Sequence, residues 1–180
     1  MDLNYFGALH TARAMAKKMV EQDDDKPRRI VFISSTVGLM GMVGFAQYAP
    51  SKYALRGLAD CLTQEFAKHR ITFHVYHVAS IATPGFESEQ ATKPNITKIL
   101  EGSDVSGDQS AGTRARVLLD GLKDNQRDIC SDFFTDLLLH CSLGVKMNIF
   151  SLPKVVLGAL LFPIVNLYFT VMINHTDFDF

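Results

Sequence analysis

A tyrosine and a lysine lie four residues apart in the segment FAQYAPSKYALRG, at Tyr48 and Lys52. Side chains with this spacing share one face of a helix, so a phenol and an ammonium group would be neighbours. The pKa of a free phenol is about 10, and a nearby cation favours its ionised form. The pair therefore indicates general acid catalysis by Tyr48 near neutral pH. The alternative is a solvated tyrosine–lysine pair without a chemical role.

Two further polar residues can join this pair. Ser35 precedes Tyr48 by thirteen residues, and the segment between them contains three glycines. Because it follows a predicted strand, this loop can return the Ser35 hydroxyl to the first turn of the helix that carries Tyr48. Ser34 is an alternative candidate for this serine, but it lies one residue away from the expected spacing to Tyr48. Asn4 can supply a fourth polar group, or it can instead cap the first helix.

The elements that must position these residues are predicted from hydrophobic periodicity. Helical spacing of apolar residues predicts helices, whereas the short β-branched runs RIVFISS and ITFHVYHV predict strands. Pro50 suits the first turn of its helix, where a missing N–H has no helical partner. The expected elements are a helix over 3–20, a strand over 29–35, a helix over 49–68, a strand over 71–78 and a helix over 110–124.

The predicted strands do not alternate between polar and apolar residues, which is typical of parallel strands buried on both faces. Alternation of helices and strands predicts the α/β class with an open, doubly wound parallel sheet. Ligands of such sheets bind beyond the carboxyl ends of the strands. We therefore expect Ser35 and the segment after Val78 to lie at the ligand edge.

Composition argues against several functional classes. The 180-residue chain has a formal net charge of −1 and no basic stripe, so we expect no nucleic-acid partner. Three widely spaced cysteines form no CxxC pair, and neither a zinc site nor a disulfide framework is predicted. His74 and His77 would point to opposite faces of a strand. We therefore expect no metal site.

The last forty residues differ in character from the rest of the chain. The segment 155–173, VVLGALLFPIVNLYFTVMI, contains no charged residue. As a helix it is long enough to span a hydrocarbon core of about 30 Å. We expect two regions, a catalytic part over 1–142 and a hydrophobic, membrane-associated tail over 143–180. The alternative is a buried or dimer-forming helix.

Ser35, Tyr48-x-x-x-Lys52 and the NYFG segment at Asn4 together resemble the catalytic tetrad of the short-chain dehydrogenase/reductase family. The resemblance implies that Tyr48 donates a proton to a substrate ketone. It also implies that Lys52 lowers the pKa of Tyr48 and holds the nicotinamide ribose. Ser35 would hydrogen-bond the carbonyl oxygen, and Asn4 would hold a water next to Lys52. Thr83, in IATPGF, would contact the nicotinamide carboxamide.

The segments YAPSKYALRGLA and TPGFESEQATKPNITKILEG, with the late apolar stretch, resemble a membrane-associated branch of this family. The branch reduces a long-chain sphingoid ketone with NADPH in sphingolipid biosynthesis. The resemblance implies a place at the endoplasmic reticulum membrane, with the catalytic part facing the cytosol. It also implies a possible homodimer through the helices over 3–20 and 49–68.

The sequence departs from the family in its cofactor motifs. It contains neither TGxxxGxG nor NNAG, the glycine-rich elements that seat the cofactor pyrophosphate at a helix terminus. Val78 and Ala79 stand where the family usually has proline or glycine. We therefore expect a truncated form, the C-terminal portion of a Rossmann-like sheet with an open edge on its first strand. A membrane-bound, non-enzymatic partner of a full-length reductase and a reductase of another lipophilic ketone both remain alternatives.

Overall fold

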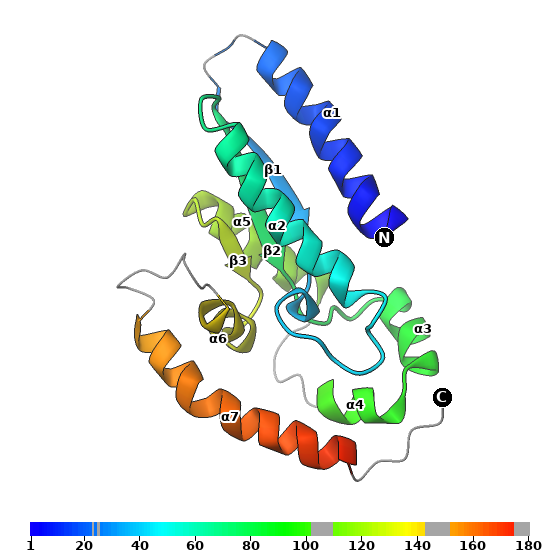
Figure 1. The fold of residues 1–180 in the computed structure, drawn as a ribbon. Helices are drawn as coiled ribbons and strands as arrows, with labels where there is room; N and C mark the ends of the chain where they lie inside the picture. Colours follow the sequence, from blue (N-terminus) through cyan, green and yellow to red (C-terminus); the bar gives the residue numbers. More distant parts are fainter. Residues whose placement is uncertain (23, 25, 102–109, 143–151, 175–180) are drawn as a thin grey trace.

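The computed structural model describes residues 1–22, 24, 26–101, 110–142 and 152–174. Three parallel strands form one sheet in the order β1-β2-β3 (Figure 1). The strands are β1 (Arg28–Ile33), β2 (Ile71–His77) and β3 (Asp128–Cys130). Arg28 pairs with Ile71, and Val75 pairs with Asp128. The predicted α/β class with a parallel sheet is confirmed.

Two long helices cover one face of the sheet. The chain starts with a π-helical turn (η1, Asp2–Gly7) that runs into α1 (Ala8–Glu21), and α2 (Ala49–Glu65) follows the glycine-containing loop. The predicted end of α2 at residue 68 is wrong, because at Phe66 the backbone leaves helical geometry. Small residues on the helices allow close packing on the sheet. The buried cluster consists of Ala12, Ala16, Phe32, Leu55, Ala59, Leu62, Ile71, Phe73 and Val75.

The opposite face of the sheet is covered by α5 (Ala111–Lys123), as the sequence predicts. Its first turn is capped by Ser110, whose Oγ accepts a hydrogen bond from Thr113 N at 3.2 Å. Val31 packs on the α5 side, whereas its neighbour Phe32 packs on the α1–α2 side. Helices on both faces make the sheet doubly wound, and they explain why these strands show no polar alternation.

Four elements lie in segments for which the sequence analysis predicts no element. They are α3 (Pro84–Thr92), α4 (Asn95–Glu101), the short β3 and α6 (Phe133–Cys141). The two longer helices among them begin at side-chain caps, at Thr83 for α3 and at Asp132 for α6. Cap residues of this kind can indicate the start of a helix in a sequence. The strand β3 is too short to show a hydrophobic periodicity.

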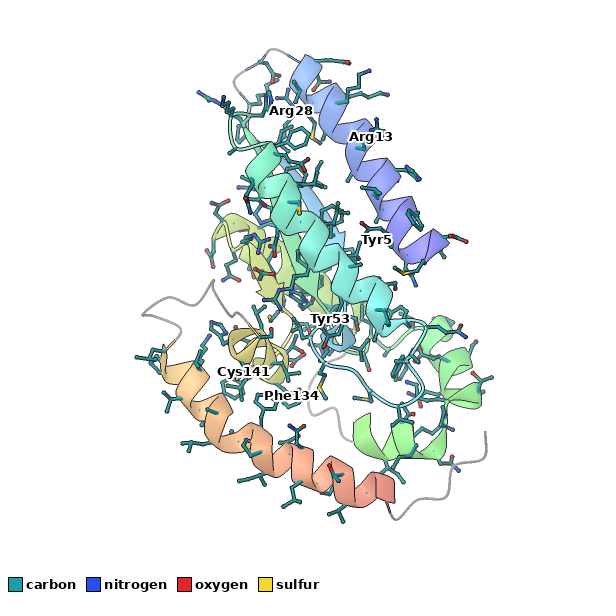
Figure 2. The ribbon with its side chains drawn as sticks, in the orientation of Figure 1. Tyr5, Arg13, Arg28, Tyr53, Phe134 and Cys141 are labelled. Atoms are coloured by element: carbon teal, nitrogen blue, oxygen red, sulfur yellow. The ribbon has the colours of Figure 1, made fainter. Side chains whose placement is uncertain are left out.

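The apolar helix α7 (Leu152–Asn174) runs along α6 and past α4 (Figure 1). Phe162 of α7 packs on Leu138 and Leu139 of α6, and an ion pair joins Lys154 to Asp136. Phe134 and Cys141 of α6 lie on the side toward α7 (Figure 2). By length and composition alone, residues Leu152–Met172 could cross a membrane, with a mean hydropathy of 2.1. The predicted tail also includes 143–151 and 175–180, which lie outside the described residues.

Candidate active site

Two consecutive serines follow β1, and the fold gives them different surroundings. The predicted strand through residue 35 is too long, since β1 ends at Ile33. Ser34 is 1% exposed and donates to the Lys52 carbonyl at 3.2 Å. Ser35 is half-buried, and its Oγ accepts a hydrogen bond from Val37 N at 3.4 Å. Of the two serines, Ser35 is the one that acts on the Tyr48 phenol, because it lowers the pKa of that group.

The close approach of the serine turn to α2 depends on a glycine. The chain after Ser35 forms a short 3-10 turn (η2, Thr36–Gly38) that packs on α2. A Cβ atom on Gly38 would lie 2.7 Å from Ser34 Oγ and 3.1 Å from Lys52 Cβ. No side chain fits at this position without displacing one of these neighbours. Gly38 thus holds the end of β1 against the helix that carries the candidate residues.

Tyr48 and Lys52 share one face of α2, as their spacing predicts. The Lys52 ammonium lies 5.4 Å from the centroid of the Tyr48 ring. It also donates a hydrogen bond to the Ile33 carbonyl oxygen at 2.9 Å. Lys52 therefore connects the end of β1 with the start of α2, and it retains donor capacity for a further ligand.

The pKa of the Tyr48 phenol is raised above its ordinary value. Burial is the main cause, the hydrogen bond from Ser35 acts in the opposite direction, and the charge of Glu89 raises the pKa further. Burial also lowers the pKa of Lys52. Lys52 is not among the groups that shift this pKa, so the lowering of the Tyr48 pKa by Lys52 stays a prediction. The ammonium faces the ring and the Ile33 carbonyl, so the loss of solvation dominates.

Asn4 lies in the π-helical turn and lines a hollow of about 540 Å³ together with Lys52. This hollow runs between α1 and the edge of β1. The first helical turn begins after Met1 and α1 begins after Gly7, so Asn4 caps neither segment. The alternative of Asn4 as a helix cap is therefore wrong, and its role in holding a water next to Lys52 stays a prediction.

Tyr48 and Thr83 line a second cavity of about 620 Å³ on the other side of the pair. Thr83 caps α3, because its Oγ1 accepts a hydrogen bond from Phe86 N at 3.2 Å. The wall includes the apolar side chains of Phe45, Val78, Ile81 and Phe86 as well as several polar side chains. Such a mixed lining around a phenol suits a ligand that has a reactive polar centre and an apolar part.

Two charged residues in this cavity escaped the sequence analysis. Glu89 and Lys93 form an ion pair at 2.8 Å between Oε1 and Nζ. The Lys93 ammonium also lies 5.3 Å from the ring centroid of Phe45 and 5.2 Å from that of Phe86. A glutamate four residues before a lysine predicts an ion pair on one face of a helix. Their place beside Tyr48 depends on the packing of α3 against the glycine-containing loop.

The segment with α3 and α4 is attached to the glycine-containing loop by a second contact. The fully buried Thr97 donates a hydrogen bond from Oγ1 to the Val43 carbonyl at 2.9 Å. The next residue, Gly44, has a φ of +85°, a conformation that side chains rarely adopt. The loop and the two helices therefore form one continuous wall of the cavity.

The two histidines of β2 have separate hydrogen-bond partners. The Nδ1 atom of His74 lies 2.6 Å from the Gln126 carbonyl oxygen, and its Nε2 lies 2.8 Å from Thr72 Oγ1. His77 Nε2 lies 3.2 Å from Asp128 Oδ1. These contacts are structural, since they connect β2 to β3 and to the turn before it.

The site residues fit one end of a nicotinamide cofactor. Hydroxyl and ammonium donors at Tyr48 and Lys52 suit ribose hydroxyls, and both hollows adjoin this pair. Thr83 lines the cavity next to Tyr48, although its Oγ1 already caps α3. The sequence has no TGxxxGxG motif, which in this family would hold the cofactor pyrophosphate at a helix terminus.

Residues 1–94 match the family model described as short chain dehydrogenase. The chain is 35% identical to the "3-ketodihydrosphingosine reductase" of Dictyostelium discoideum over 98% of its own length and 51% of that protein. It is 37% identical to the "3-dehydrosphinganine reductase" of Danio rerio over 66% of its own length and 34% of that protein. The chain thus spans about half, or less, of the length of these relatives.

Solved structures share the fold at low sequence identity. A short chain dehydrogenase from Burkholderia cenocepacia J2315 in complex with NADP matches 80% of this chain and 54% of its own, with a TM-score of 0.61 and 16% identity. A short chain dehydrogenase/reductase from Burkholderia phymatum in complex with NAD matches 81% of this chain and 57% of its own, with a TM-score of 0.58 and 18% identity.

Proposed function

The chain belongs to the short chain dehydrogenase family, and from this premise we propose that it is part of an NADPH-dependent reductase of 3-ketodihydrosphingosine. The product would be dihydrosphingosine, a precursor in sphingolipid biosynthesis. The names of the relatives from Dictyostelium discoideum and Danio rerio support this substrate. The proposal concerns the full-length reductase, because the chain matches about half of such proteins.

One observation carries the proposed chemistry: the Lys52 ammonium lies 5.4 Å from the centroid of the Tyr48 ring, and Ser35 is close enough to the phenol to lower its pKa. The ketone oxygen of the substrate would bind between the two hydroxyl groups. Tyr48 would donate its proton to this oxygen while the carbonyl carbon accepts a hydride, which gives the alcohol. Ser35 would stabilise the negative charge that develops on the oxygen. The nicotinamide cofactor supplies the hydride when it is bound.

The remaining site residues would hold the cofactor and the proton path. Lys52 would bind the ribose hydroxyls while keeping its bond to the Ile33 carbonyl, since an ammonium has three donors. Asn4 would hold a water beside Lys52, in the hollow that both residues line. Thr83 would contact the carboxamide. The choice of NADPH over NADH is proposed from the resemblance to the sphingoid ketone reductases.

The proposed location is the endoplasmic reticulum membrane, with the catalytic part in the cytosol. The apolar composition of α7 supports membrane contact by the tail over 143–180, because only 6% of its most apolar window is buried in the protein. A lipid surface would also be the source of the long-chain substrate. A homodimer through α1 and α2 is part of the same proposal.

The proposal is tested by Tyr48→Phe in the detergent-solubilised, full-length reductase with 3-ketodihydrosphingosine. Removal of the proton donor should lower kcat by about 10²- to 10⁴-fold, because a positioned acid contributes about that much. The matched control is Tyr53→Phe, which removes a phenol from the exposed side of the same helix (Figure 2). Equal activity of the two variants would exclude Tyr48 from the mechanism.

A second candidate function is that of a non-enzymatic, membrane-bound partner of a full-length reductase. In the part of the chain that the structure describes, β1 pairs only with β2, so its other edge is open to another strand. Titration of the purified 180-residue chain with NADPH, followed by fluorescence, distinguishes the candidates. Low-micromolar binding would favour an enzyme, whereas no saturable binding, together with co-purification of a full-length reductase, would favour the partner.

A third candidate is a reductase of another lipophilic ketone, such as a steroid or a retinoid. The phenol, serine and lysine of the site act on a carbonyl group and do not distinguish the rest of a substrate. Comparison of kcat/KM for 3-ketodihydrosphingosine with that for a steroid ketone tests this candidate directly.

A further inference from the structure

The ion pair in the cavity beside Tyr48 is asymmetric in its exposure. Only 4% of the Lys93 side chain is exposed, whereas 48% of the Glu89 side chain is exposed. Both residues line the same cavity as Tyr48. A ligand that enters this cavity therefore meets the carboxylate more readily than the ammonium.

The surroundings of Lys93 explain why its ammonium group is buried although the residue lines the cavity. The rings of Phe45 and Phe86 lie 5.3 and 5.2 Å from its ammonium, within the range of cation–π attraction. A third contact is the Glu89 Oε1 atom, at 2.8 Å. These contacts, together with the low exposure of the side chain, keep the ammonium away from an anionic ligand in the cavity.

Glu89 keeps binding capacity after it has paired with Lys93. The ion pair with Lys93 uses Oε1, and a carboxylate offers about four acceptor positions on two oxygens. Glu89 and Tyr48 line the same cavity, and the charge of the carboxylate raises the pKa of the phenol. A substrate placed with its ketone at Tyr48 would therefore have its neighbouring atoms in the field of Glu89.

We infer that Glu89 is a specificity-determining residue, whose carboxylate binds an ammonium group that the substrate carries next to its ketone. This inference rests on the proposed function and deepens it. The ketone of 3-ketodihydrosphingosine has an amine-bearing carbon as its neighbour, and this amine is protonated near neutral pH. Glu89 would accept a charge-assisted hydrogen bond from it. The apolar walls at Phe45, Val78 and Ile81 would contact the hydrocarbon part of the molecule.

The test compares two substrates of equal chain length in the full-length reductase. One is 3-ketodihydrosphingosine, and the other is the corresponding long-chain ketone without the amine. Glu89→Gln preserves the shape of the side chain and removes its charge. We expect kcat/KM to fall at least about tenfold for the amino ketone, as for loss of a hydrogen bond to a charged group. For the ketone without the amine, we expect a change of less than about twofold.

Two matched variants separate recognition from a structural effect. Glu87→Gln changes an exposed carboxylate on the same helix that does not line the cavity, and it should leave both substrates unaffected. Lys93→Met breaks the ion pair and should affect both substrates alike. If Glu89→Gln lowers kcat/KM equally for both substrates, or for neither, the inference is wrong.

A binding measurement separates failure of the inference from failure of the proposed function. Dihydrosphingosine and the matching alcohol without the amine are titrated into the 180-residue chain in detergent micelles. Binding of the amine should be at least about tenfold tighter, and Glu89→Gln should remove that difference. A reductase that is inactive on both ketones would overturn the proposed function. Equal binding of amine and alcohol by the unmodified chain would overturn the role of Glu89.

Discussion

At the scale of single residues, the proton affinity of Tyr48 is decided by competition between neighbours. Burial raises the pKa of the phenol, the Ser35 hydroxyl lowers it, and the Glu89 carboxylate raises it. The lysine one turn away does not reverse this balance, because its own ammonium is partly buried and bonded to Ile33. A further positive charge beside the phenol, such as the charge that develops on a nicotinamide as its hydride leaves, would lower this pKa.

The first prediction at this scale concerns Ser35→Ala. Loss of the hydrogen bond that lowers the pKa should raise the pKa of Tyr48 further above its ordinary value of 10.0. The measurement is a pH titration by NMR of ¹³C-labelled tyrosine, with the Tyr48 signal assigned through Tyr48→Phe. Ser88→Ala, on the outer face of α3, serves as the control and should change nothing. An unchanged or lowered pKa in Ser35→Ala would contradict the site geometry.

The raised pKa of Tyr48 also affects stability at alkaline pH. The folded chain holds the phenol proton more tightly than the unfolded chain, so folding binds protons in this range. The contribution of Tyr48 to the free energy of unfolding is fully present below about pH 10 and is lost as the pH rises through the raised pKa. Urea titrations across this range should show a steeper loss of stability for the unmodified chain than for Tyr48→Phe.

At the scale of secondary-structure elements, glycines decide how closely the helices approach the sheet. Gly121 lies on the buried side of α5, and a Cβ atom there would be 2.7 Å and 2.9 Å from the branch carbons of Ile129. Ile129 is almost fully buried in β3, so it has no space to move. The contact between α5 and the short strand β3 therefore depends on a residue without a side chain.

We expect Gly121→Ala to lower the free energy of unfolding by about 1–3 kcal/mol through overpacking. This loss should exceed the gain in helix propensity, which is at most about 1 kcal/mol. The matched control is Gly112→Ala in the same helix, where the nearest atom, Ser110 Oγ, is at 3.9 Å, and it should be neutral or slightly stabilising. Urea denaturation measures both variants, and equal stability of the two would contradict the described packing.

At the scale of the whole molecule, α7 presents two different faces. On the protein side, Phe162 packs on Leu138 and Leu139 of α6. On the other side, Leu160, Ile164 and Leu167 repeat at helical spacing and are 67%, 65% and 64% exposed. A contiguous apolar surface of this kind is typical of contact with a membrane or another protein. We propose that this outer face of α7 contacts the bilayer.

A prediction for the whole molecule follows from this outer face. Leu160→Glu should lower the partition of the chain onto lipid vesicles at least about tenfold, because a charge inside the hydrocarbon is costly. Stability should change little, since the side chain has few protein contacts to lose. Leu119→Glu on α5, which is 56% exposed, is the control and should bind vesicles normally. Vesicle sedimentation gives both values, and equal partition of the two variants would exclude α7 from membrane contact.

The sequence alone determined the features that depend on local spacing. Helical periodicity gave the helices that became α1, α2 and α5, and the four-residue spacing placed Tyr48 and Lys52 on one face. Apolar runs without alternation gave the parallel strands β1 and β2, because both of their faces are covered. These features arise from interactions between residues close in the chain, which a sequence displays directly.

Only the tertiary structure decided the features that depend on contacts between distant segments. Ser34 donates a hydrogen bond to the backbone of α2, whereas Ser35 acts on the phenol of Tyr48. The two serines are adjacent in the sequence, which does not indicate which of them has which role. Likewise, Lys93 is buried between two aromatic rings and leaves Glu89 as the more exposed charge. The direction of the Tyr48 pKa shift could also not be predicted from the sequence. It is the balance of burial against polar contacts, and both are set by elements that meet only in the folded chain.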